Sequence, residues 1–167
     1  MSETVFLGLG ANLGDRQANL TAACRMLNES EGVCGLQKSA LYETAPWGRL
    51  EQPPFLNAVI CFSYEHSPQR LLARCQEIEA ALGRRREPGL PWGPRTLDID
   101  ILLFGALQMQ TPELTIPHPY LCQRAFVLAP LGDLAPKRWL PGIGSVEAAL
   151  AGVDAGGVQK IAPPGAW

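Results

Sequence analysis

The chain has 167 residues, which suits one domain with a substantial core, so we expect residues 1–167 to form a single domain. Hydrophobic residues make up 47% and charged residues 18%, which excludes a disordered, fibrous or coiled-coil protein, and the net charge of -2 argues against a nucleic-acid partner. The chain has no apolar run of membrane-spanning length and no signal-peptide pattern, so we expect a cytoplasmic protein without a membrane partner.

The N-terminal part is expected to form a strand over residues 5–9, with a loop over residues 8–14. The glycine spacing in this loop, G-x-G-x-x-x-G, is one residue too long for the dinucleotide-binding fingerprint, and no acidic residue ends a second strand at the required distance. Asp15 can cap a helix that runs to about residue 29. Its buried face should hold Leu20, Cys24 and Leu27.

Apolar and polar residues alternate enough over residues 33–42 to predict a second strand. A proline-rich loop follows over residues 43–54. A third strand is predicted over residues 55–62, with Phe55 and Asn57 on the same face. An aromatic ring beside an amide can stack on a flat heterocycle and hydrogen-bond to it. The same pair also occurs as ordinary packing beside a turn, so both interpretations stay open.

A second helix is expected to begin at Ser67 and Pro68 and to end at Gly83. Its buried stripe should hold Leu71, Leu72, Cys75, Ile78 and Leu82. Gln76 and Glu79 lie off this stripe and should face either water or a site.

The connector over residues 84–94 contains three consecutive arginines and Trp92. Positive charge of this kind is what a bound polyphosphate needs. We expect a mobile basic lid here, and a solvated charged connector is the alternative.

The strand predicted over residues 97–104 carries two aspartates among apolar residues. Side chains alternate along a strand, so Asp98 and Asp100 point to one face and their apolar neighbours to the other. Two adjacent carboxylates repel each other unless a cation lies between them, and Mg²⁺ prefers oxygen ligands. Arg95 has a guanidinium suited to phosphate oxygens. This pattern predicts a site for magnesium and phosphate, and an exposed strand end with solvated aspartates is the alternative.

An extended segment is expected over residues 114–119, where prolines restrict the backbone. His118 lies there among polar residues, and both a structural and a functional role are open. A helix or turn over residues 124–131 follows. Residues 142–167 should contain a short helix capped by Ser145, and they hold no motif with recognisable chemistry.

The five cysteines are scattered along the chain, and none belongs to a C-x-x-C pair. This argues against a disulfide framework and against a structural zinc site. We expect reduced thiols in the core.

The predicted order β-α-β-β-α-β with a C-terminal extension suggests an α+β, ferredoxin-like fold, with helices packed on an antiparallel sheet. The string R-x-x-D-[apolar]-D-[apolar]-[apolar], with Gly-Pro before the arginine, resembles the signature of the 6-hydroxymethyl-7,8-dihydropterin pyrophosphokinase family of folate biosynthesis. The resemblance covers residues 8–136 and implies the same fold. Its four blocks are residues 10–15, residues 42–46 with 52–57, residues 92–104, and residues 117–119 with 124–126.

The resemblance implies an enzyme that transfers diphosphate from MgATP to the hydroxymethyl group of 6-hydroxymethyl-7,8-dihydropterin, giving the pterin diphosphate and AMP. It implies two Mg²⁺ ions, bound with ATP, and we expect a monomer. No Walker loop, G-x-x-x-x-G-K-[ST], occurs in the chain, so metals and arginines must neutralise the phosphates.

The resemblance also implies roles for single residues. The metal ligands are Asp98 and Asp100, and the catalytic residues are these two with Arg84 and Arg95. The pterin is sandwiched by Phe55 and Phe126, and the rest of its site is Thr44, Ala45, Trp47, Asn57 and Asp98. The ATP site consists of Gln76, Glu79, Arg86, Trp92, Arg95, Ile101, Thr115, His118 and Arg124.

Two other functions are compatible with parts of the sequence. A metal-dependent nucleotidyl transferase or phosphodiesterase also suits paired strand aspartates, but it leaves Phe55, Asn57 and Phe126 unexplained. A small-ligand or RNA-binding module with the same fold leaves Asp98 and Asp100 unexplained.

Overall fold

The computed structural model of the chain describes residues 1–44, 53–83 and 96–167. Several predictions made above fall on other residues and so lie outside the described part. They concern the basic lid and the site residues Ala45, Trp47, Arg84, Arg86, Trp92 and Arg95.

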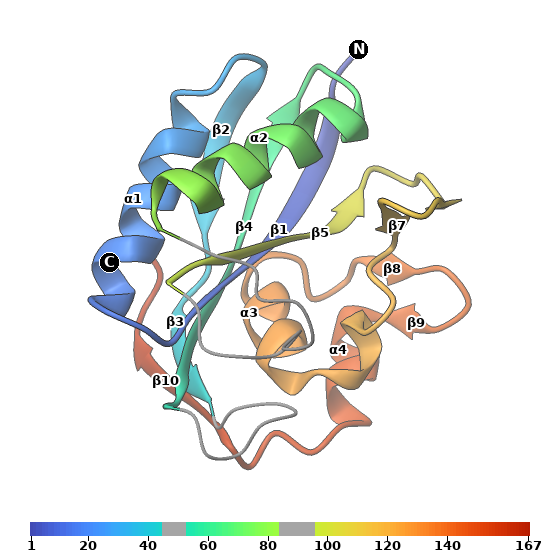
Figure 1. Ribbon diagram of the computed structural model, residues 1–167. Coiled ribbons are helices and arrows are strands. Elements are labelled where there is room, and N and C mark those ends of the chain that lie inside the picture. The colour runs from blue at the N-terminus through green and yellow to red at the C-terminus, as the bar shows by residue number, and fades with distance from the viewer. Residues whose placement is uncertain (45–52, 84–95) are drawn as a thin grey trace.

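An antiparallel sheet of six strands organises the described residues (Figure 1). Its strands are β1 (Glu3–Ala11), β2 (Val33–Lys38), β3 (Leu41–Thr44), β4 (Phe55–Tyr64), β5 (Asp98–Phe104) and β10 (Val158–Ala162). The order is β10-β3-β4-β1-β5, and β2 also pairs with β4. With β2 and β3 counted as one interrupted strand, this is the ferredoxin-like arrangement, so the predicted α+β fold is confirmed.

Helices cover both faces of this sheet (Figure 1). They are α1 (Arg16–Asn28), α2 (Pro68–Ala81), α3 (Ala125–Leu134) and α4 (Val146–Ala151). Helices α1 and α2 lie on one face, whereas α3 and α4 lie on the other. The shorter elements are β6 (Met109–Gln110), β7 (Thr115–Ile116), the 3-10 helix η1 (Leu121–Gln123), β8 (Trp139–Leu140) and β9 (Gly144–Ser145).

The predicted helix starts are correct. The carboxylate of Asp15 accepts a hydrogen bond from the amide of Ala18 at 3.1 Å, and the hydroxyls of Ser67 and Ser145 cap α2 and α4 in the same way. Each such cap contributes about 1 kcal/mol by satisfying an amide that the helix leaves unbonded.

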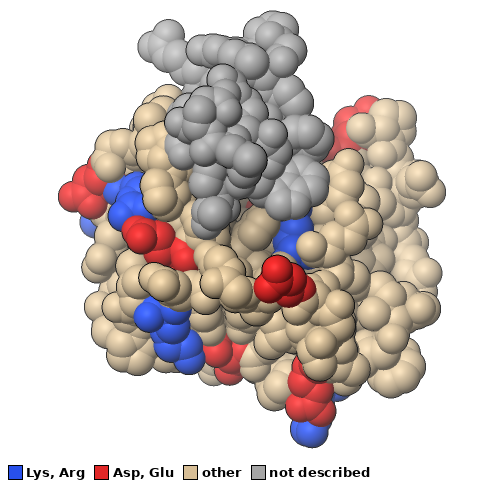
Figure 2. Space-filling view, turned by 90° about the horizontal axis from the view of Figure 1, so that it is seen from below, with Lys and Arg blue, Asp and Glu red and all other residues tan. Residues whose placement is uncertain are grey.

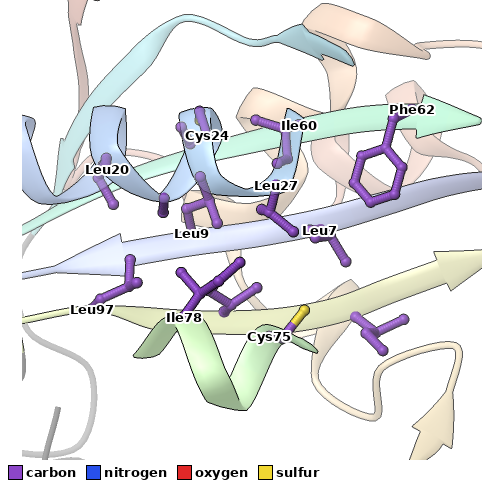
Figure 3. Close-up of a cluster of buried hydrophobic side chains, with 14 of the residues drawn as sticks. Leu7, Leu9, Leu20, Cys24, Leu27, Ile60, Phe62, Cys75, Ile78 and Leu97 are labelled. Carbon is purple, nitrogen blue, oxygen red and sulfur yellow. The ribbon is translucent and has the colours of Figure 1, made fainter. Parts of the chain in front are cut away.

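The main core fills the space between the sheet and helices α1 and α2. Figure 3 shows Leu20, Cys24 and Leu27 of α1 beside Leu7 and Leu9 of β1, with residues of β4 and α2 around them. A fully buried leucine side chain contributes roughly 1.5–3 kcal/mol, so this core holds β1 firmly between its neighbours. A second, smaller core packs α3 and α4 against the opposite face.

Three element predictions were wrong. Residues 8–11 continue β1 instead of forming a loop, because they pair with β4 and Gly8 and Gly10 also pair with β5. The strand predicted over residues 33–42 is two strands, β2 and β3. Between them, the amide of Ala40 donates a hydrogen bond to the carboxylate of Asp133 at 3.1 Å. Strand β10 was not predicted, because it is mostly exposed and shows no alternation.

The cysteines only partly match the prediction. All five lie in the described residues as free thiols, but only Cys24 and Cys75 are buried, and Cys34 is exposed. The expectation that all five cysteines belong to the core was therefore wrong. Within residues 1–44, 53–83 and 96–167, every helix falls short of the length and apolar character that crossing a membrane requires.

Candidate active site

The floor of the site is the part of β1 that contains two glycines. Gly10 pairs with Asn57 of β4 and with Asp98 of β5, and Gly8 pairs in the same way with Val59 and Asp100. Directly paired residues point to the same face of an antiparallel sheet, so the glycines leave open space between the amide of Asn57 and the two carboxylates.

A side chain at Gly10 would close this space. A Cβ atom there would lie 3.0 Å from Nδ2 of Asn57, which is tighter than ordinary packing. The sequence interpretation missed Gly8 and Gly10 as site residues because it placed them in a loop. Phe6, Gly8 and Gly10 stand at every second position, which is the spacing of residues on one face of a strand. This spacing could have identified the two glycines as strand residues.

A pocket opens above this floor, on the face of the sheet that carries α3. All the described residues that were predicted to bind pterin line it, namely Thr44, Phe55, Asn57, Asp98 and Phe126. The other lining residues are Gly8, Leu9, Gly10, Ala58, Val59, Asp100, Leu102, Arg124 and Val127. The structure therefore gathers residues from β1, β3, β4, β5 and α3 into one pocket, with aromatic and apolar walls and a few polar groups.

Asn57 is held by a neighbour within this pocket. The hydroxyl of Thr44 donates a hydrogen bond to Oδ1 of Asn57 at 2.7 Å, and both residues are buried, with 4% and 8% of their surface exposed. Arg124 was predicted to bind ATP, and its guanidinium carbon lies 5.5 Å from the ring centroid of Phe126 in the same pocket.

A second depression lies between α2, β5 and the β6–β7 pair. Five residues that were predicted to bind ATP line it, namely Gln76, Glu79, Ile101, Thr115 and His118. Asp100 lines both the pocket and this depression. The two predicted binding sites therefore adjoin each other at β5.

Glu79 is buried, with 3% of its surface exposed, so it does not face water. Its Oε2 accepts a hydrogen bond from the backbone amide of Ile99 at 2.8 Å. Since Ile99 lies between Asp98 and Asp100, this carboxylate fixes the backbone of β5 at the two aspartates. The contact links α2 to the site. The sequence placed Glu79 off the apolar stripe of its helix but did not identify this partner.

His118 faces Asp100, with 3.9 Å between Nε2 and Oδ2. The amide of Tyr120 donates a hydrogen bond to Nδ1 of His118 at 3.2 Å, so a neutral ring carries its proton on Nε2. Burial, the largest cause, and the charge of Arg124 together lower the pKa of His118 from 6.5 to about 4, while Asp98 opposes them. His118 is thus neutral at pH 7 and presents an N–H group towards Asp100.

The donor set on β5 suits Mg²⁺. Asp98 and Asp100 are half-buried and lie two residues apart on one face of the strand. Among the described residues, no three His, Cys, Asp or Glu side chains gather into a metal cluster. Mg²⁺ commonly takes one or two carboxylates and completes its shell with water and substrate phosphates, so two aspartates are sufficient.

Figure 2 shows the charged side chains on one face of the molecule. On the part of this face that the structure describes, acidic and basic residues are interspersed, with no extended patch of positive charge. This distribution differs from the continuous basic surface typical of a nucleic-acid-binding protein.

Comparisons with known proteins agree on one family. The family model for 7,8-dihydro-6-hydroxymethylpterin-pyrophosphokinase (HPPK) matches residues 6–136. A 2-amino-4-hydroxy-6-hydroxymethyldihydropteridine pyrophosphokinase from Methylorubrum extorquens is 42% identical over 156 residues, which is 93% of this chain and 97% of that protein. The protein of the same name from Pseudomonas aeruginosa is 39% identical over 166 residues, covering 99% of this chain and 100% of its own length.

A solved structure supports the fold. The wild-type HPPK-DHPS of Plasmodium falciparum with pteroate matches with a TM-score of 0.70 and 15% identity, over 91% of this chain. The chain spans only 42% of that longer protein. At this identity the likeness concerns the fold alone.

Proposed function

Because this chain belongs to the 7,8-dihydro-6-hydroxymethylpterin-pyrophosphokinase family, we propose that the pocket above Gly8 and Gly10 holds the pterin and that the adjoining depression holds ATP. The chain transfers the diphosphate group of ATP to the hydroxymethyl group of the dihydropterin, a step of folate biosynthesis. The products are the pterin diphosphate and AMP.

The observation that carries this assignment is the position of Asp100 at the junction of the two sites. The bond that forms joins the pterin hydroxymethyl oxygen to the β-phosphorus of ATP, so both substrates must meet at one place. Phosphoryl transfer depends mainly on positioning and on charge stabilisation. A carboxylate shared by both sites is well placed to organise that meeting.

The pterin would be held by aromatic stacking on its faces and by hydrogen bonds along its edge. Phe55 and Phe126 come from β4 and α3, and both line the pocket. Aromatic faces on a flat heterocycle supply burial and stacking, while Asn57 supplies hydrogen bonds at the edge. Water is displaced from this space when the ring enters, which protects the β-phosphorus from hydrolysis.

Asp98 and Asp100 would hold the Mg²⁺, and we propose two ions. When bound, Mg²⁺ neutralises phosphate charge and orients the reacting oxygens. The buried carboxylate of Glu79 keeps the intervening amide of Ile99 in place, and the neutral ring of His118 offers a proton donor beside Asp100. Arg84 and Arg95 remain proposed residues for charge neutralisation.

The reaction can be tested by incubating the chain with ATP, 6-hydroxymethyl-7,8-dihydropterin and Mg²⁺ and following the phosphorus nuclei by NMR. We expect AMP and the pterin diphosphate in equal amounts. Free pyrophosphate would instead indicate a nucleotidyl transferase, and ADP would indicate transfer of a single phosphate group. Either result would contradict diphosphate transfer.

We propose that residues 1–167 form one domain, which the sharing of a single sheet by both cores supports. We also propose a cytoplasmic monomer without a nucleic-acid partner. Five free thiols, one of them exposed, suit a reducing compartment. Light scattering of the purified chain would test the oligomeric state.

A further inference from the structure

The side chain of Thr44 points at another side chain of the pterin pocket. Its hydroxyl donates to Oδ1 of Asn57 at 2.7 Å across the β3–β4 pair. With 4% of Thr44 and 8% of Asn57 exposed, water competes little for this hydrogen bond. A buried acceptor that loses its hydrogen-bond donor destabilises the protein, so this contact constrains Asn57 strongly.

This contact divides the amide of Asn57 into two ends with different roles. An asparagine amide has one acceptor atom and one donor group. Oδ1 is engaged by Thr44, on the β3 side. Nδ2 lies on the β1 side, where it would be only 3.0 Å from a Cβ atom at Gly10. The hydroxyl on one side and the missing side chain on the other thus set the orientation of the amide.

We propose that Thr44 is a positioning residue that acts through Asn57. Its hydroxyl holds Oδ1 against β3, so the NH₂ group of Asn57 is presented over Gly10 as a donor. This group would recognise a lone-pair acceptor, a ring nitrogen or a carbonyl oxygen, on the edge of the pterin. The inference rests on the proposed assignment of the pocket to the pterin, and it adds which end of Asn57 reads the ring and what orients it.

Tertiary contacts hold Thr44 in this position. Strand β10 pairs with β3, and Val158 lies opposite Thr44. Two residues earlier in β3, the hydroxyl of Tyr42 donates a hydrogen bond to the carboxylate of Asp133 in α3 at 2.8 Å. The same helix carries Phe126 at its start, so β3 and the aromatic wall of the pocket are tied to each other.

A double-mutant cycle separates positioning from direct contact. The dissociation constant of 6-hydroxymethylpterin is measured by calorimetry with saturating Mg²⁺ and α,β-methylene-ATP, in which the scissile oxygen is replaced. The variants are Thr44→Val, which keeps the shape without the hydroxyl, Thr44→Ser, which keeps the hydroxyl, Asn57→Ala, and Thr44→Val combined with Asn57→Ala. Thr44→Ala replaces Thr44→Val if the valine variant does not fold.

We expect Thr44→Val to weaken pterin binding about tenfold, the effect of losing roughly one hydrogen bond, while Thr44→Ser stays within about twofold of the unchanged chain. In the Asn57→Ala background, Thr44→Val should have no further effect, because a residue that acts only through Asn57 has nothing left to position. Affinity for the nucleotide analogue should not change in any variant.

Each other outcome identifies what is wrong. An equal loss from Thr44→Val with and without Asn57 would show a direct contact and overturn the positioning role. If Asn57→Ala weakened binding and Thr44→Val did not, the positioning role would be wrong while the pocket assignment survived. If Asn57→Ala itself left pterin affinity unchanged, the proposed pocket assignment would fail.

Discussion

Asn57 and Asp98 lie on the same face of the central sheet, on either side of Gly10, which pairs with both. Neighbouring strands are about 4.8 Å apart, so the backbones that carry the amide and the carboxylate are separated by roughly 10 Å. A flat bicyclic ring with its edge at Asn57 can therefore extend its hydroxymethyl group towards β5. Gly10 therefore lies between the proposed ring-binding amide and the proposed metal-binding carboxylate.

Substitution of Gly10 tests this relationship. In Gly10→Ala the new methyl group would lie 3.0 Å from Nδ2 of Asn57, so the amide must move into the space of the ring. We expect pterin binding to weaken by at least tenfold in calorimetry, with nucleotide binding unchanged. Gly157→Ala is a matched control, because nothing lies within 4 Å of a Cβ atom there. Equal pterin affinity in both variants would contradict the glycine floor.

The second prediction concerns the metal ligands. Asp98→Asn and Asp100→Asn each remove a charged oxygen from the proposed Mg²⁺ site, and turnover at saturating Mg²⁺ should fall by about 100-fold or more. Both side chains are half-buried at a strand end, so the melting temperature should change little. Asp154→Asn, at an exposed position near the C-terminus, serves as the control. Full activity in either of the two β5 variants would exclude that residue as a ligand.

The aromatic walls give a third prediction. Phe55→Ala and Phe126→Ala should each weaken pterin binding by about 1–2 kcal/mol, through lost stacking and burial. Nucleotide affinity should change little, since neither ring lines the second depression. Fluorescence titration with the pterin measures the effect, and wild-type affinity in both variants would rule out the sandwich.

The fourth prediction concerns His118 in the metal-free protein. Burial lowers the pKa of His118 in the folded state to about 4, below its ordinary value of 6.5. The folded state therefore favours the neutral ring, and the unfolded state binds the proton first as the pH falls. The contribution of His118 to the free energy of unfolding is fully present above pH 6.5. It decreases by about 3 kcal/mol as the pH falls to 4.

Proton NMR can follow this titration directly, because the chain has only two histidines. The Hε1 resonance of His118 should have its midpoint near pH 4. His118→Gln should lose less stability than the unchanged chain over the same interval in denaturant unfolding. A midpoint near 6.5 would contradict the buried, neutral ring.

Local patterns in the sequence were sufficient to predict several features of this protein. The helix starts at Asp15 and Ser67 follow from capping chemistry within a few residues, and the structure has both. The shared face of Asp98 and Asp100 follows from the two-residue period of any strand. The resemblance of four sequence blocks to one enzyme family predicted the function, and the comparisons confirm that family.

Other parts depended on which strands pair and in what register. Gly10 becomes a floor only because β4 and β5 bring Asn57 and Asp98 to its two sides. Glu79 reaches the amide of Ile99 only because α2 packs against β5. Register is set by burial on both faces of the sheet, a property of the whole core. Residue types, the strand period and the family resemblance therefore predicted the chemistry, whereas long-range packing decided which side chains meet in the pocket.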